Sequence, residues 1–141
     1  MNGLFAIRKL LIDDSAVSAL VSTKVFPGMV PEGTAMPCIY LKVDSVDPTI
    51  SKSSNSDLDR YMITLQCMAE TMSEANSIGE AVRDVLDYYS GDVTLSNGTT
   101  TIRRARITDF SNFTEEEVSR TIHVIEHEYE VDVKRTAEVT L

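Results

Sequence analysis

The feature of this 141-residue sequence that most constrains its fold is a strict two-residue alternation near its end. Five largely apolar residues alternate there with four acidic ones, namely Ile125, His127, Tyr129, Val131 and Val133 with Glu126, Glu128, Glu130 and Asp132. Such alternation is typical of a β-strand with one buried and one solvent-exposed face. A helix capped by Thr114 is the alternative, since four residues recur at helical spacing: Val118, Ile122, Ile125 and Tyr129. The helical stripe includes fewer residues, so we favour a strand.

Helical periodicity predicts two helical regions upstream of this strand. The first opens the chain and has a kink or break near residues 13–14, unless it runs on as one helix. The second begins at Thr71 or Ser73, and Thr71 with Glu74 has the form of a capping box. We expect it to stop at residues 90–91, where a Gly follows the last turn.

The other predicted strands span residues 38–43, 58–68, 93–95 and 99–108. Asn97-Gly98 between the last two is a strong hairpin signal. The polar segment 44–57 is expected to be a long loop, and residues 109–117 are expected to turn the chain into the final strand. The adjacent pair Val124-Ile125 suggests a bulge in that strand.

These elements predict an α+β fold with a single mixed, mostly antiparallel sheet and two main helices packed on one face. The length fits one domain over residues 1–141. The net charge of −9 is unevenly spread: residues 1–70 carry −2 and residues 71–141 carry −7. An acidic chain is poorly suited to neutralising phosphates, which argues against a general nucleic-acid-binding protein.

Chemistry-bearing motifs are missing from the sequence. It has no phosphate-binding loop, no zinc-ligand spacing and no nucleophile motif. On a strand, His123 and His127 would share a face but lie about 13 Å apart, too far to bind one ion. We therefore expect no enzyme, no cofactor and no metal site. Cys38 and Cys67 are expected to be buried, reduced thiols, and without a secretory signal or an apolar run of membrane-spanning length we expect a cytoplasmic protein.

The only basic cluster of the sequence comprises Arg103, Arg104 and Arg106. On a strand, Arg104 and Arg106 would share one face and Arg103 would take the other. These arginines could pair across strands with the acidic residues of segment 118–132, or they could contact another subunit. The acidic face of the final strand must be solvated or paired with cations, because like charges on one face repel.

Several short motifs follow one another in a characteristic order: DDSAVSALV (13–21), KVFPG (24–28), VPEGTAMPCI (30–39), LQCMAE (65–70), SEAN (73–76) and VRDVL (82–86). The final alternating strand follows them. This order resembles that of the tail completion proteins of long-tailed bacteriophages, a family that includes tail terminators and tail-to-head joining proteins.

This resemblance implies a small, non-catalytic, cofactor-free subunit that assembles as a ring, typically of six copies. Such a ring caps the head-proximal end of the tail tube, stops tube growth and presents a surface to the head connector. The partners would be other copies, the tube protein and the connector or stopper, with DNA passing through the lumen without specific binding. The protein would then be part of the virion after assembly in the host cytoplasm. A small cytoplasmic binding or regulatory domain is the alternative.

For a ring, the charged residues are our candidate contacts with subunits or partners: Arg103, Arg104, Arg106, Glu126, Glu128, Glu130, Asp132, Asp47, Lys52 and Asp57. Complementary acidic and basic strands would set the register between copies. A lumen lined by the carboxylates of residues 126–132 would repel DNA phosphates, which is the competing interpretation. The loop 44–57 is predicted to become ordered on the tube or the connector.

Overall fold

The computed structural model describes residues 2–48 and 58–134. Its helices are α1 (Asn2–Asp13), α2 (Ser15–Val21) and α3 (Met72–Leu86). Its strands are β1 (Val25–Pro27), β2 (Cys38–Asp47), β3 (Leu58–Ala69), β4 (Gly91–Leu95), β5 (Gly98–Glu116) and β6 (Thr121–Lys134). The fold is therefore α+β, as predicted.

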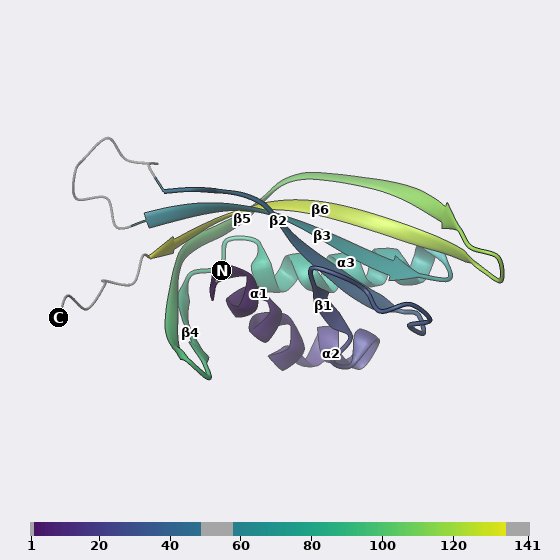
Figure 1. Cartoon of the computed structure of the whole chain (residues 1–141), viewed down its shortest axis with the longest axis horizontal. Coiled ribbons are helices and arrows are strands. Elements are labelled where there is room, and N and C mark those ends of the chain that lie inside the picture. The colour runs from purple at the N-terminus through teal and green to yellow at the C-terminus, as the bar shows by residue number, and fades with distance from the viewer. Residues whose placement is uncertain (1, 49–57, 135–141) are drawn as a thin grey trace.

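The strands form one mixed sheet in the order β1-β2-β3-β6-β5-β4. β1 pairs with β2 in parallel, and every other neighbouring pair is antiparallel. Figure 1 shows the three helices together on one side of the sheet, which curls around them at β4 and the start of β5. The central strands β3 and β6 pair from Leu58↔Lys134 to Ala69↔His123.

The final strand is a strand throughout, which decides between the two interpretations of its sequence. The side chains of Tyr129 and Val131 lie in the main core with Ile63, Leu65 and the α3 residue Ile78. No bulge occurs at Val124-Ile125, because β6 pairs continuously with β3. The register shifts lie instead in β5, between Ile102 and Arg104 and between Ile107 and Asp109.

The predicted break between the first two helices is confirmed at Asp14, whose carboxylate accepts hydrogen bonds from the backbone N–H groups of Ala16 and Val17. Thr71, rather than Ser73, is the N-cap of α3, and its hydroxyl accepts a bond of 3.2 Å from the Glu74 N–H.

The prediction that α3 stops at residues 90–91 was wrong, because α3 ends at Leu86. The chain then begins to pair with β5: the Tyr88 N–H donates to the Ala105 carbonyl, and the Ala105 N–H donates to the Tyr89 carbonyl.

Two strands run further than predicted. β2 continues to Asp47, so the first part of the predicted loop 44–57 is strand; residues 49–57 lie outside the described residues. A bulge at Asp44 turns its carboxylate toward the Thr64 hydroxyl, which donates to it. Residues 109–116 do not turn the chain but extend β5, because β6 offers a pairing partner for all of them. The hairpin turn itself comes later, at 117–120.

The two faces of the sheet differ in what covers them. The odd-numbered residues of β6 from Ile125 onward face the helices, and Gly79 brings α3 close: a Cβ there would lie 3.2 Å from Ile125 Cγ2. The opposite face, which we call the open face, carries the even-numbered residues of β6. Its end near the hairpin turn holds a second, smaller apolar cluster: Cys38, Met68, Ile122 and Val124, with Phe26, Val30, Met36, Tyr40 and Phe113.

Candidate functional site

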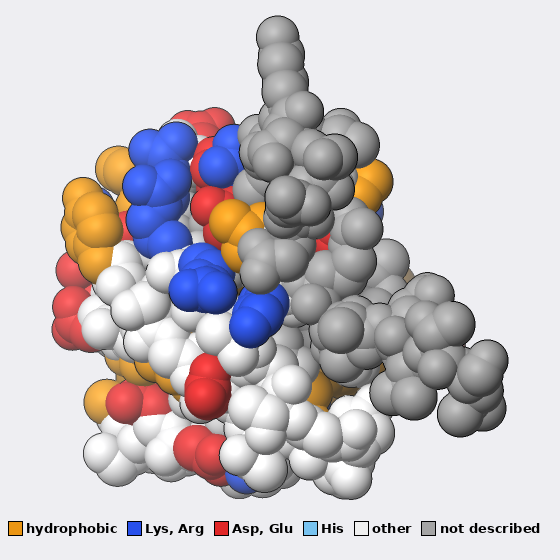
Figure 2. All heavy atoms as spheres, turned by 90° about the vertical axis from the view of Figure 1, so that its left-hand side faces the viewer, with side chains coloured by type: hydrophobic (Ala, Val, Ile, Leu, Met, Phe, Trp, Pro, Cys, Tyr) orange, Lys and Arg blue, Asp and Glu red, His pale blue; other side chains and the backbone are white. Residues whose placement is uncertain are grey.

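The open face is divided by charge along the length of β5 and β6. Where β3 begins and β6 ends, it carries Arg60, Arg104, Arg106 and Lys134, and the exposed Arg103 adjoins them in the β5 bulge. We call these five residues the cationic end. They are five of the eleven Lys and Arg residues in the described part of the chain. Figure 2 looks onto this side of the molecule and shows blue side chains gathered over it, with red ones beside them. An acidic protein thus has a locally basic surface.

Beneath these cations lie two of the predicted acidic residues. The Glu130 and Asp132 side chains are only 12% and 10% exposed. Arg60 donates to both carboxylate oxygens of Asp132, at 2.9 and 3.3 Å, and its Nε lies 2.9 Å from Glu130 Oε1. Arg106 donates to Glu130 Oε2 at 3.3 Å from the other side, and Arg104 approaches Glu130 at 3.9 Å. The hydrogen bond to Asp132 raises the pKa of Arg60 above its ordinary value.

Cross-strand pairing of the arginines with the acidic strand is therefore present for Arg104 and Arg106. Arg60 was missed from the sequence, because only the register of β3 against β6 places it opposite Asp132. Arg103 lies in the bulge after Ile102, where it has no partner on β6. Both Arg103 and Arg104 are exposed between the buried Ile102 and Ala105.

Toward the hairpin turn, the same face becomes acidic. Four carboxylates lie there, and we call them the carboxylate half: Asp109, Glu115, Glu126 and Glu128. Asp109 is opposite Glu128 in the register, and Glu115 is opposite Ile122. The Asp109 and Glu115 side chains are exposed. Glu126 accepts a hydrogen bond from Gln66 at 3.0 Å. Among the described residues, none of the four has an ion pair within the chain, in contrast to Glu130 and Asp132.

The remaining predicted contact residues, Asp47, Lys52 and Asp57, lie outside these two surfaces or outside the described residues. Asp47 ends β2 opposite Arg60 in the register. Lys52 and Asp57 lie outside the described residues. Because arginines cover Glu130 and Asp132, only the Glu126 and Glu128 part of the predicted stripe presents carboxylates that are not already ion-paired.

The His and Cys side chains belong to the packing of the sheet. His127 is buried, and its Nδ1 lies 3.1 Å from the Tyr129 hydroxyl. Burial lowers the pKa of His127, and it raises the pKa of Cys38 to about 11. Both thiols are buried, as predicted. Within residues 2–48 and 58–134, no group of three or more His, Cys, Asp or Glu is placed to hold a metal ion.

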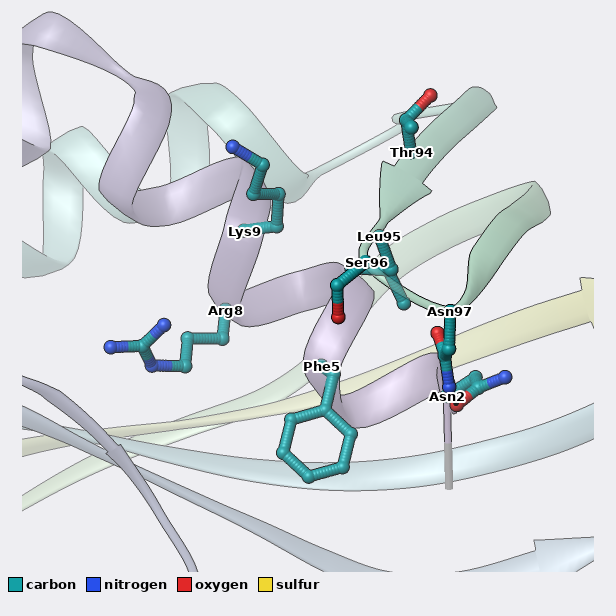
Figure 3. Close-up of a pocket in the computed structure, with 8 residues that line it drawn as sticks. All are labelled: Asn2, Phe5, Arg8, Lys9, Thr94, Leu95, Ser96 and Asn97. Carbon is teal, nitrogen blue, oxygen red and sulfur yellow. Dashed lines mark hydrogen bonds between the residues drawn. The ribbon is translucent and has the colours of Figure 1, made fainter.

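A surface groove of about 430 Å³ runs between α1 and β4 (Figure 3). Its lining combines one exposed aromatic ring with polar and basic residues: Asn2, Phe5, Arg8, Lys9, Thr94, Leu95, Ser96 and Asn97. The basic groups are already engaged, since Arg8 Nε donates to the Val25 carbonyl at 2.9 Å and Lys9 pairs with Asp13. In Figure 3 the Phe5 ring and the Arg8 guanidinium point away from the β4 residues. Neither hydroxyl of the lining, that of Thr94 or that of Ser96, is hydrogen-bonded to a basic side chain among the described residues, so the groove shows no nucleophile paired with a base.

No α-helix of the described part is both long enough and apolar enough to cross a bilayer. The sequence matches the family of tail completion protein gp17 over residues 5–133. The chain belongs to this family. No curated protein matches it. Among solved structures, one similar chain comes from the virion of a native gene transfer agent particle, with a TM-score of 0.68 and 18% identity. The alignment covers 94% of this chain and 96% of that one, and at this identity it supports the fold.

Family membership confirms the resemblance expected from the sequence motifs. The protein is a structural component of a phage tail. This gives the charged surface a context: a tail component works by binding other proteins, so the cationic end and the carboxylate half are candidate contact surfaces.

Proposed function

We propose that this tail completion protein forms a ring, of six copies, at the head-proximal end of the tail tube. There it ends tube growth and joins the tail to the head connector, with all 141 residues acting as one domain. DNA passes through the opening without specific binding, and the ring is assembled in the host cytoplasm. The observation that carries the proposal is the family match over residues 5–133, because a protein that completes a tail acts where the tube stops.

The sheet offers support for a ring in the form of two unlike free edges. On one side, β4 pairs only with the start of β5, from Gly98 to Ile102, and Tyr88 and Tyr89 hydrogen-bond to Ala105. Along residues 109–116, β5 has β6 on one side and no further strand among the described residues on the other. Alternate N–H and C=O groups of that stretch are available for pairing with another chain.

The opposite side of the sheet has a free edge of its own. β1 pairs with β2 only at Ile39, Tyr40 and Leu41, so residues 42–46 of β2 have no outer strand in the described part. A closed ring needs a heterologous contact, made by two different surfaces of each copy. The β5 edge and the β2 edge are two such surfaces.

Assembly and tail length together test the proposal. The purified protein, alone and mixed with tail tubes, should run in native mass spectrometry or sedimentation at a multiple of 15.6 kDa, with six copies as the expected species. Phage particles made without the protein should yield tubes of uncontrolled length that fail to join heads. Tails of normal length that join heads in its absence would refute the function, and a chain that stays monomeric even with tubes would refute the ring.

A further inference from the structure

We propose that neighbouring copies meet through charge on the open face, the cationic end of one copy lying against the carboxylate half of the next. This inference rests on the proposed ring and names the surface that closes it. The two surfaces lie toward opposite ends of β5 and β6, since Arg104 is opposite Asp132 and Glu115 is opposite Ile122. A contact between them is therefore heterologous, as a ring requires.

The cationic end is arranged to present charge outward. The carboxylates of Glu130 and Asp132 are nearly buried and hold Arg60 and Arg106 in place from below. Arg103 and Lys134 are exposed and have no ion pair within the described residues. Asp47 also lies close to Arg60, so five cations stand against three carboxylates, and this surface retains positive charge after its internal pairs are formed.

The carboxylate half has no ion pairs of its own among the described residues, whereas the cationic end has more cations than carboxylates. Asp109 and Glu115 are exposed, and Glu126 and Glu128 are half-buried. Like charges this close on one face repel one another, and a cationic surface from another copy would relieve that repulsion.

The free strand edges lie near parts of both surfaces. Residues 42–46 of β2 lie toward the cationic end, because Asp47 is opposite Arg60 in the register. Residues 109–116 of β5 lie along the carboxylate half. If these edges meet in the ring, Asp109 and Glu115 of one copy lie at the joined edge, and the neighbour's Arg60 lies one strand in from it, on β3 of the same continued face.

A second copy fits the cationic end better than a nucleic acid does. Each copy carries a net charge of −9, so copies repel one another unless basic surfaces are placed at their contacts. The cationic end is already partly neutralised from below and has no aromatic side chains among its members, whereas binding of nucleic-acid strands commonly combines cations with aromatic stacking.

Charge reversal at exposed positions tests the contact. The variant Arg103→Glu with Lys134→Glu should associate roughly 10- to 100-fold more weakly than the wild-type protein, because attraction becomes repulsion. Adding Glu115→Lys and Glu128→Lys to the same chain restores the original net charge and should restore ring formation. A separate chain carrying only Glu115→Lys and Glu128→Lys, mixed in equal amounts with the Arg103→Glu, Lys134→Glu chain, should also form rings, since unlike charges then meet at every contact between alternating copies.

The control reverses two cations on the helix side, Lys9→Glu with Arg83→Glu, for the same change in net charge. It should assemble normally, and thermal melts should show all variants folded. Rings that form equally well from the Arg103→Glu, Lys134→Glu variant would overturn the charge contact while leaving the ring intact. Duplex DNA binding that this variant loses while its rings persist would also overturn it. A wild-type chain that never assembles, even on tubes, would refute the proposed ring itself.

Discussion

Replacing Arg60 by Met tests whether the arginine layer holds the buried carboxylates of β6. Methionine keeps much of the apolar stem but removes the guanidinium. Asp132 then loses both hydrogen bonds that it accepts from Arg60, at 2.9 and 3.3 Å, while its side chain is only 10% exposed. Glu130 keeps Arg104 and Arg106. The cost of the substitution therefore falls chiefly on Asp132.

The size of the effect follows from the exposure of the two partners. Breaking a fully buried ion pair costs about 3–5 kcal/mol, and hydrogen bonds to charged groups contribute about 1.5–3 kcal/mol net. The Arg60 side chain is 35% exposed, so solvent screens part of the interaction. We expect a loss of about 2 kcal/mol in the free energy of unfolding, or roughly 6–8 °C in Tm for a chain of this length.

Urea unfolding and thermal melts measure this loss. The control Arg104→Met removes a 53% exposed side chain that approaches Glu130 only to 3.9 Å, and it should cost less than about 0.5 kcal/mol. Combining Arg60→Met with Asp132→Asn also removes the buried carboxylate that Arg60→Met leaves without its partner. The double variant should recover about half or more of the lost free energy of unfolding. If Arg104→Met proved the costlier single change, or if the double variant were less stable than Arg60→Met alone, the reasoning would be wrong.

Two further predictions concern packing beneath the sheet. Burial lowers the pKa of His127, with Arg83 lowering it further and Glu80 opposing, so the unfolded chain binds a proton more readily than the folded one. The free energy of unfolding should therefore fall as pH drops below about 6.5, and His127→Gln should flatten this dependence in urea titrations. Thr71→Ala removes the acceptor for the Glu74 N–H and should cost about 1 kcal/mol in thermal melts, whereas Ser73→Ala should change little; equal losses would contradict the capping assignment.

Local patterns were sufficient for much of the fold. Alternation over residues 125–133 predicts β6 and its buried face, Asn97-Gly98 predicts the β4–β5 hairpin, and the caps at Asp14 and Thr71 are where side-chain chemistry places them. Each depends on neighbours within a few residues, which is the range that periodicity and capping rules cover.

The errors arose where pairing between distant segments overrides local preference. Residues 109–116 are polar and were expected to turn, but β6 offers them a partner and they extend β5. α3 ends early because the backbones of Tyr88 and Tyr89 hydrogen-bond to β5 at Ala105. The bulge that exposes both Arg103 and Arg104 has no local signal, because it depends on how β5 fits the register of β6.

The charged surface is the clearest case of such a distant effect. Read along β6 alone, Glu126, Glu128, Glu130 and Asp132 form one uniform acidic stripe. In the sheet, Arg60 from β3 and two arginines from β5 cover its second half, so the sign of the surface reverses between Glu128 and Asp132. A uniform stripe would repel the same stripe on another copy. A face with unlike halves attracts a second copy only when that copy is displaced so that its basic half meets the acidic half of the first. In the proposed ring, the net charge of −9 still causes repulsion between copies, and the unlike halves of the open face supply the local attraction that opposes it.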